Sequence, residues 1–259
     1  MTQHGESPEL DVALITPGPP WRPVEVLPEV GSTNAVLREA PVSWRVVVAE
    51  RQVEGRGRLG RDWVTVQGRG LAVSALVPAE GMAVGWVPLT AGLALAEAIG
   101  EVSGVEAVLK WPNDVQLPAN DHRKVAGILC EWVPLDGGGV VIGAGINVHH
   151  TREELPVPEA TSVALAGGAC TREALLTAYL RLLAGHLRTL ASDPAAVRES
   201  YAARCASLGA EVIVHEPAGE RHGRVTAIDE EGRLCLQGED GPVAVAAGDV
   251  VHVRTQGQG

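Results

Sequence analysis

Phenylalanine is absent from this sequence of 259 residues, and only six tryptophans and two tyrosines supply aromatic side chains. Hydrophobic residues still make up 46% of the chain, which is typical of a globular protein with one large or two unequal domains. Long apolar runs are also missing. The longest stretch without a charged residue covers the sixteen residues 81–96 and contains Gly85, Pro88 and Gly92. Because a membrane-spanning helix needs about 20 apolar residues, the sequence predicts no membrane span.

A secretion signal and a cysteine framework are missing as well. Residues 1–9 are polar and acidic, so the N-terminus does not resemble a signal peptide and we expect a cytoplasmic protein. The few cysteines form no CxxC pair and have no histidine at ligand spacing, which predicts reduced thiols and no metal-ligating residues. These cysteines are Cys130, Cys170, Cys205 and Cys235.

Positive charge is scarce, since the formal net charge is −11 and the isoelectric point is about 5.2. This balance argues against nucleic acid or an anionic lipid surface as a partner. One segment differs from the average. Residues 51–69 hold five arginines against Glu54 and Asp62, which gives a local charge of +3. A cluster of arginine and glycine favours a small anionic ligand over a long polyanion.

The pattern of elements divides the chain into three parts. Residues 1–25 are rich in proline and glycine and predict an irregular N-terminal arm. Helical and strand-like patterns follow as far as residue 207, and five short alternating segments between residues 211 and 254 predict a small β-barrel. The expected helices cover 33–39, 86–102, 171–190 and 194–207, and the expected strands cover 44–49, 70–77, 107–110, 125–132 and 140–148.

The glycine-rich segment at residues 55–60 reads Gly-Arg-Gly-Arg-Leu-Gly and matches the dinucleotide fingerprint GxGxxG. That fingerprint needs a helix at its third glycine, but residues 61–68 contain β-branched residues and a glycine instead of helix formers. A P-loop is also excluded, because Arg61 and Asp62 stand where lysine and serine or threonine are required. The alternatives are a solvated basic loop and an anion-binding loop, and the arginine density in an acidic chain favours the second.

Lys110 ends an apolar run and begins the sequence Lys-Trp-Pro-Asn-Asp. A lysine at a strand end is often a surface residue with a buried stem. Here Pro112 fixes the direction of the chain, and the side chains of Asn113 and Asp114 can order the turn, which favours a lysine held in a fixed position. The strand at 140–148 contains two glycines, which weaken a strand unless a ligand or another backbone passes close by.

Taken together, these segments resemble the biotin protein ligases in content, order and spacing, over residues 27–254. The related lipoate ligases share the fold but lack the pair of motifs at 55–61 and 110–114. The matching motifs are Gly-Ser-Thr-Asn at 31–34, Ala-Glu-Arg-Gln at 49–52, Gly-Arg-Gly-Arg-Leu-Gly-Arg-Asp-Trp at 55–63, Lys-Trp-Pro-Asn-Asp at 110–114, Arg-Lys-Val-Ala-Gly-Ile-Leu at 123–129 and Gly-Ala-Gly-Ile-Asn-Val at 143–148.

The resemblance implies an α+β fold. Residues 26–207 would form a catalytic domain similar to class II aminoacyl-tRNA synthetases, with a mixed sheet, and residues 208–259 an SH3-like β-barrel. The implied activity is ATP-dependent attachment of biotin to a lysine of a biotin carboxyl carrier domain through biotinyl-5'-AMP, with Mg²⁺ accompanying ATP. Lipoate or octanoate transfer on the same fold is the alternative. The implied partners include no nucleic acid, and a homodimer stays open.

The resemblance also assigns residues. Biotin's carboxylate and ATP are both anions, so positive charge and aligned donors are needed where they meet. The catalytic residues would be Lys110, Arg56 and Arg58. Biotin would be bound by Ser32, Thr33, Asn34, Gln52, Gly55, Arg56, Gly57, Arg58 and Lys110. The nucleotide would be bound by Arg58, Arg61, Trp63, Asn113, Lys124 and Asn147.

Three features depart from the family pattern. Leu59 stands where many bacterial members have an arginine, and an insertion-like stretch at residues 117–122 lengthens the link between two motifs. The helix-turn-helix domain of the repressor subgroup has no room in the first 26 residues, so the resemblance is to the monofunctional type. A biotin-sensing repressor would need such a module, and a non-catalytic adenylate or nucleic-acid binder would not need Lys110.

Overall fold

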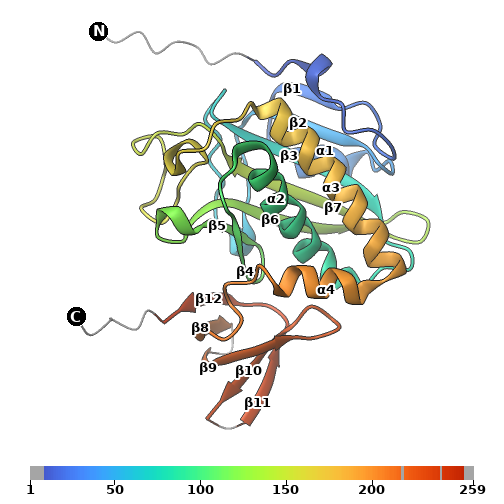
Figure 1. The fold of residues 1–259 in the computed structure, drawn as a ribbon. Helices are drawn as coiled ribbons and strands as arrows, with labels where there is room; N and C mark the ends of the chain where they lie inside the picture. Colours follow the sequence, from blue (N-terminus) through green and yellow to red (C-terminus); the bar gives the residue numbers. More distant parts are fainter. Residues whose placement is uncertain (1–8, 217–218, 240, 254–259) are drawn as a thin grey trace.

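The computed structural model describes residues 9–216, 219–239 and 241–253. A seven-stranded mixed sheet with the order β1-β2-β3-β7-β6-β5-β4 forms the larger part of the molecule (Figure 1). β1 pairs parallel with β2, and each of the other neighbouring pairs is antiparallel. The strands are β1 (Glu25–Val30), β2 (Val46–Gln52), β3 (Gly70–Pro78), β4 (Val108–Lys110), β5 (Asp114–Leu117), β6 (Arg123–Val133) and β7 (Gly139–Asn147).

Alternating side chains of the central strands divide the core between the two faces of this sheet. Val46 and Val48 of β2 belong to the larger apolar cluster, which includes helices α2 (Val87–Ser103) and α3 (Arg172–Ser192). Val47 points the other way and packs with Leu37 of helix α1 (Thr33–Glu39). Figure 1 shows α2 and α3 side by side against the sheet. The short helix α1 therefore packs on the face of the sheet opposite to α2 and α3. The polar motifs gather on this same face.

The predicted elements up to residue 190 match the structure within a few residues at their ends. Strands β1 and β5 were not expected from the sequence. β1 is a partly exposed edge strand with a proline in it, and β5 has only four residues, so neither has a distinct apolar pattern.

The predicted helix at 194–207 is wrong in its second half. Helix α4 (Pro194–Ala202) begins as expected, with Asp193 Oδ1 accepting a hydrogen bond from the amide of Ala196 at 3.3 Å. After residue 202 the backbone instead pairs with the edge strand β4, where Leu109 N donates to Arg204 O at 2.9 Å. These hydrogen bonds satisfy the backbone at an exposed sheet edge and end the helix.

The first part of the predicted irregular arm, residues 1–8, lies outside the described residues. Residues 9–24 contain a 3-10 turn at Val12–Leu14 and neither an α-helix nor a strand, in agreement with their proline content. They are nevertheless part of the core, since the amide of Leu10 donates to Glu50 Oε1 at 2.5 Å and the indole of Trp21 donates to Leu180 O at 2.7 Å. Their buried side chains are Leu10, Ile15, Trp21 and Val24.

The C-terminal part is a separate five-stranded antiparallel sheet with the order β11-β10-β9-β8-β12. Its strands are β8 (Glu211–Glu216), β9 (Gly219–Ile228), β10 (Leu234–Gly238), β11 (Gly241–Val245) and β12 (Asp249–His252). The expected barrel-like module and the α+β class are therefore confirmed. The remaining residues of the predicted tail, 217–218, 240 and 254–259, lie outside the description.

Two buried tryptophans attach the small sheet to the large one. Trp86 Nε1 donates to Asp229 O at 3.0 Å, and Trp111 Nε1 donates to Gly232 O at 2.9 Å. Gly85 lies against the same β9–β10 turn, where a Cβ atom would be 2.0 Å from Glu231 O. The turn is therefore held by both indoles and by a close backbone contact. Among the described residues, no helix is both long and apolar enough to cross a membrane.

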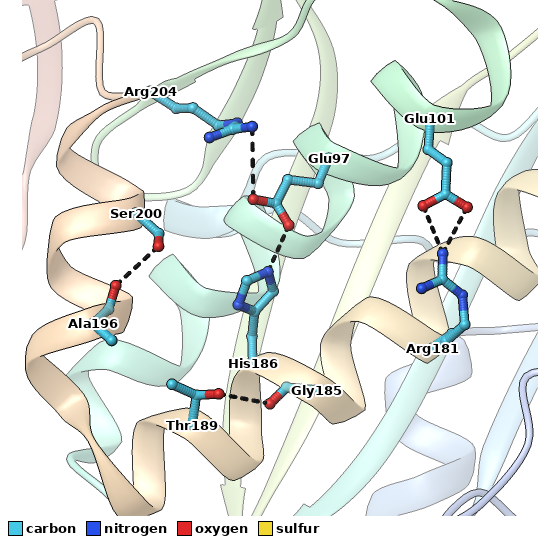
Figure 2. A network of polar contacts seen from close by, with 9 residues as sticks. All are labelled: Glu97, Glu101, Arg181, Gly185, His186, Thr189, Ala196, Ser200 and Arg204. Carbon is cyan, nitrogen blue, oxygen red and sulfur yellow. Dashed lines mark hydrogen bonds and ion pairs between the residues drawn. The ribbon is translucent and has the colours of Figure 1, made fainter.

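Helices α2 and α3 and the segment that follows α4 are also connected by polar contacts, shown in Figure 2. His186 Nε2 lies 2.6 Å from Glu97 Oε2, and Arg204 Nη2 lies 3.7 Å from Glu97 Oε1. The hydrogen bond with His186 lowers the pKa of Glu97, although burial opposes this effect. One helical turn along α2, Glu101 pairs with Arg181 at 2.6 Å, and both of these side chains are about half exposed.

The contacts of Glu97 and of Glu101 predict different losses of stability when the carboxylate is changed to an amide. Glu97→Gln should lower the free energy of unfolding by about 1 to 2 kcal/mol, because a largely buried histidine and an arginine lose their charged partner. Glu101→Gln is the matched control and should cost no more than about 0.5 kcal/mol, because its ion pair is exposed. Urea unfolding of the two variants measures both values, and equal losses would contradict this account.

Candidate active site

A cavity of about 1420 Å³ opens between the α1 face of the large sheet and strand β12 of the small sheet. It is lined by parts of the chain that are far apart in sequence, and it collects all of the predicted site residues except Gly55. The predicted residues that line it are Ser32, Thr33, Asn34, Gln52, Arg56, Gly57, Arg58, Arg61, Trp63, Lys110, Asn113, Lys124 and Asn147.

One end of the cavity, called the ring end below, is formed by the start of α1 and the end of β2. Gln52 Oε1 accepts hydrogen bonds from Thr33 N at 2.8 Å and from Thr33 Oγ1 at 3.0 Å. Its amide oxygen is therefore used within the protein, and the amide NH₂ group is left as a donor. Ser32 caps α1 with no side-chain hydrogen bond to the helix.

Asn34 lies beside this pair and is almost fully buried. Its Oδ1 atom is 2.6 Å from the hydroxyl of Ser74, which is also 2.7 Å from Thr33 Oγ1. Opposite Asn34, strand β7 has a glycine at position 143, where a Cβ atom would lie 2.3 Å from Asn34 Oδ1. Only glycine leaves room for this side chain, which explains one of the two glycines in the strand pattern.

The arginine-rich segment at 55–63 forms a closed loop. Gly57 N donates to Arg61 O at 2.7 Å, and Trp63 N donates to Gly55 O at 2.8 Å. Between them lies a 3-10 turn at Arg58–Gly60, and no α-helix follows, in agreement with the exclusion of a dinucleotide fingerprint. Gly55 is buried under the loop, because a Cβ atom there would lie 2.4 Å from Trp63 O. Gly55 therefore shapes the loop and does not line the cavity.

The cations of this loop have different surroundings. Arg56 is exposed, whereas burial lowers the pKa of the partly buried Arg58. Arg58 Nη1 lies 3.4 Å from Asn113 Oδ1, which joins the loop to the 110–114 motif. Arg61 pairs with Asp249 of β12. Leu59, at the tip, is 70% exposed and has a φ of 57°.

Lys110 is the last residue of β4, and it lies opposite Asp114 in the β4–β5 pairing. Burial lowers the pKa of its ammonium group, while the charge of Asp114 acts in the opposite direction. The next residue is fixed, because Trp111 is 2% exposed and its amide donates to Ser207 Oγ at 3.1 Å. The backbone beside the lysine is therefore held in place.

Trp63 and Lys124 lie over the middle of the sheet. The Trp63 ring rests on Gly145, where a Cβ atom would be 2.1 Å from the ring, and on Gly127 of the neighbouring strand. Lys124 Nζ lies 5.7 Å from the centroid of this ring and 2.6 Å from Asp114 Oδ1. The second glycine of the β7 pattern is thus explained by an aromatic side chain.

Asn113 and Asn147 are the last of the predicted site residues that line the cavity. Asn113 Nδ2 donates to Ile128 O at 2.9 Å, and Asn147 Nδ2 donates to Thr161 O at 3.0 Å. Both amides are therefore oriented by backbone carbonyls. Within the described part of the chain, no group of three or more His, Cys, Asp or Glu side chains is arranged to hold a metal ion.

Sequence reasoning missed the contribution of the small sheet to this cavity. Asp249 and His252 of β12 line it, as do Asp114 and His122. Asp114 belongs to a motif that was recognised, and His122 lies in the insertion-like stretch at residues 117–122, which connects β5 to β6. Neither Asp249 nor His252 has a local sequence signal, because only the docking of the two sheets brings β12 to the site.

Two models of protein families match this chain. Residues 29–147 match the model of the biotin/lipoate A/B protein ligase family, and residues 207–253 match that of the biotin protein ligase C-terminal domain. The biotin--[acetyl-CoA-carboxylase] ligase of Mycobacterium tuberculosis is 36% identical over 255 residues, 93% of each chain. That of Paracoccus denitrificans is 34% identical, over 87% of this chain and 98% of the relative. The bifunctional ligase/repressor BirA of Escherichia coli is 31% identical, over 90% and 74%.

Solved structures of biotin protein ligases have a similar fold. The biotin protein ligase of Aquifex aeolicus in complex with biotin and ATP has a TM-score of 0.75 and 29% identity, covering 90% of this chain and 99% of that one. The Leishmania major enzyme in complex with biotinyl-5-AMP has a TM-score of 0.61 and 25% identity, covering 89% and 100%.

The family models and the solved structures place this fold, with its cation-rich cavity between the two sheets, in the class of biotin and lipoate protein ligases. The chain belongs to the biotin protein ligase family. It is an enzyme that attaches biotin to protein through biotinyl-AMP, and the lipoate alternative is not favoured.

The site predicts a pH dependence of stability through His252. Its Nε2 atom lies 3.0 Å from Ser207 Oγ, and burial, with a contribution from the charge of Lys110, lowers its pKa from 6.5 to about 4. A histidine held neutral contributes stability above its unfolded pKa, and this contribution is lost as the pH falls from 6.5 towards 4. Between pH 7.5 and 5 the loss should be about 1 to 2 kcal/mol.

Urea unfolding of the wild type and of His252→Gln at both pH values measures this loss. Glutamine has no charge to gain, so the stability advantage of the wild type over the variant should shrink on acidification. A difference that stays constant with pH would show that His252 titrates normally.

Proposed function

We propose that this chain catalyses the ATP-dependent biotinylation of a lysine in a biotin carboxyl carrier domain, in the cytoplasm where ATP is supplied. The observation that carries this proposal is one cavity with two chemically different ends. The ring end has fixed neutral hydrogen-bonding groups, while the opposite end gathers Lys110, Arg58 and Lys124 around Asp114. This arrangement suits a substrate with a neutral polar ring and an anionic tail.

We assign the ring end to the cyclic urea of biotin. Ser32, Thr33 and Gln52 present hydroxyl and amide groups to the cavity, and Asn34 lies beside them. A cyclic urea carries a carbonyl acceptor between two N–H donors. The free NH₂ group of Gln52 matches the acceptor, and the hydroxyl oxygens match the donors.

We assign adenylate formation to the cations at the end of the cavity opposite the ring end. A carboxylate oxygen of biotin attacks the α-phosphorus of ATP, and pyrophosphate leaves. Both reactants are anions, so Lys110, Arg56 and Arg58 would lower the barrier by stabilising the charge that gathers on the phosphate oxygens. Mg²⁺ bound to ATP would neutralise the leaving pyrophosphate.

The nucleotide would lie over the centre of the sheet. Trp63 and Lys124 offer an aromatic face and a cation, and Asn113 and Asn147 offer oriented amides. Arg61 would exchange its contact with Asp249 for the adenylate. Because Asp249 and His252 line the cavity, we propose that residues 208–259 complete the site built by residues 26–207.

In the second step the amine of the acceptor lysine attacks the carbonyl carbon of the mixed anhydride, and AMP leaves. No protein nucleophile is required, since the anhydride already has a good leaving group. We propose no nucleic-acid partner, and the homodimer stays a prediction. Exposed apolar side chains at the cavity rim offer a contact for the carrier: Leu59, Val64, Val157 and Val251.

The proposal is tested by incorporation of labelled biotin into a biotin carboxyl carrier domain, run beside labelled lipoate with its own acceptor domain. We expect ATP-dependent transfer of biotin and none of lipoate. Preferential transfer of lipoate, or no transfer of either, would overturn the assignment.

Lys110→Ala should slow adenylate formation by about 10²- to 10³-fold, because a positive charge on the reacting groups is lost. Biotin-dependent exchange between pyrophosphate and ATP measures this step directly. Folding should be little affected, which a melting curve checks. Exchange at the wild-type rate would show that Lys110 has another role.

Arg58→Ala should weaken retention of biotinyl-AMP more than binding of biotin, because Arg58 lies on the side of Asn113 and away from the ring end. The release of biotinyl-AMP into solution, measured without acceptor, should rise. Arg56→Ala is the matched control in the same loop, and its exposed side chain should have the smaller effect. Equal losses of biotin and adenylate affinity in Arg58→Ala would place this arginine at the ring end instead.

A further inference from the structure

One wall of the cavity is a turn of residues 157–160, called the wall turn below. The amide of Ala160 donates to Val157 O at 3.2 Å, which closes the turn. Pro158 occupies its second position, where proline is favoured in β-turns. All four residues line the cavity, together with Pro156 before them.

The wall turn lies beside Lys124. Lys124 N donates to Glu159 O at 2.8 Å, and Thr161 N donates to Lys124 O at 2.8 Å. The carbonyl oxygen of Thr161 also accepts a hydrogen bond from Asn147 Nδ2 at 3.0 Å. Lys124 and Asn147 are two of the residues that we assign to the nucleotide, so the wall turn borders that part of the cavity.

The guanidinium group of Arg152 binds the backbone of the wall turn. Its Nη1 atom donates to Ala160 O at 2.7 Å and lies 3.4 Å from Pro158 O, while its Nη2 atom donates to Val157 O at 2.8 Å. The planar fork of an arginine side chain allows it to bind several acceptors at once. Arg152 itself does not line the cavity, so it acts on a ligand through the turn.

Every carbonyl oxygen of the wall turn therefore has a protein partner, and Arg152 supplies three of the four contacts. The contact with Ala160 O is partly buried, so water replaces this donor less easily than it replaces the two exposed contacts. Without the guanidinium group, the turn would keep only its closing hydrogen bond and the contact with Lys124. It would then have more positions to choose from.

We propose that Arg152 is a positioning residue that holds the wall turn against Lys124 and so forms the nucleotide side of the cavity before ATP binds. This inference rests on the proposed function, because it takes this part of the cavity to bind ATP. A preformed wall raises affinity, since the substrate does not have to supply the free energy that orders it. When the wall is in place in only a fraction of the molecules, the apparent affinity for ATP falls by that fraction.

The test is Arg152→Lys, which keeps the positive charge but replaces the planar fork by a single ammonium group. In the biotinylation of a carrier domain, we expect KM for ATP to rise about tenfold, because charge-assisted hydrogen bonds to the turn are lost. KM for biotin should stay within about twofold, since the ring end is formed by α1 and β2. The value of kcat at saturating substrates should also stay within about twofold, because Lys110 and Arg58 are untouched.

Hydrogen exchange of the protein without ligand is a second measurement, and it does not depend on activity. The amides of Ala160 and Thr161 should exchange faster in Arg152→Lys, because their hydrogen bonds to Val157 O and Lys124 O open more often. Exchange in helix α2 should be unchanged, which shows that the fold is intact.

Arg69→Lys is the matched control, because it makes the same chemical change in the same region. Arg69 Nε lies 3.1 Å from Glu154 Oε1, in the same connection between β7 and α3, but its side chain neither contacts the wall turn nor lines the cavity. KM for ATP and the exchange of Ala160 and Thr161 should both stay within about twofold of the wild type.

An unchanged KM for ATP in Arg152→Lys would overturn the inference, as would an equal rise of both KM values. A higher KM for ATP with unchanged exchange, or the same rise in Arg69→Lys, would overturn it too. In each of these cases the wild type still transfers biotin and the proposed function stands. A wild type that transfers no biotin would overturn the proposed function, and hydrogen exchange would still decide whether Arg152 holds the wall turn.

Discussion

The close approach of side chains to glycines on strand β7 is the constraint on which the cavity depends. Gly143 and Gly145 are two residues apart, so they face the same side of the sheet. Asn34 occupies the space above the first, and the ring of Trp63 occupies the space above the second. One stretch of backbone without side chains thus supports both the ring end of the cavity and the part lined by Trp63. A side chain at either position would displace a residue of the site.

The small sheet packs beside the candidate active site and also forms part of its wall. Trp111, next to Lys110, donates its indole N–H to Gly232 and its backbone amide to Ser207. Strand β12 adds Asp249 and His252 to the cavity wall. The position of Lys110 therefore depends on the docking of two sheets, which gives a physical reason for keeping both parts in one chain.

The electrostatics of the cavity show how an acidic protein concentrates positive charge, with carboxylates that offset the repulsion between neighbouring cations. Lys124 pairs with Asp114, Arg61 pairs with Asp249, and Asp114 also offsets the effect of burial on Lys110. These carboxylates compensate the cations of the cavity. A polyanionic substrate would take their place in part, so that the cations keep a counter-charge in a protein with a net charge of −11.

The sequence by itself determined the class of fold, most of the elements and a set of site residues of which all but Gly55 line the cavity, because these are encoded in local patterns. Gly55 to Trp63 and Lys110 to Asp114 are contiguous motifs, and apolar periodicity marks helices such as α2. The tertiary structure alone decided where helix α4 ends, because the pairing of Leu109 with residues 204–206 joins distant segments. It also decided that Asp249 and His252 line the cavity. A contact between residues about 100 or more positions apart, such as Asn34 with Glu131, arises only when strands pair and sheets dock, so no local pattern can record it.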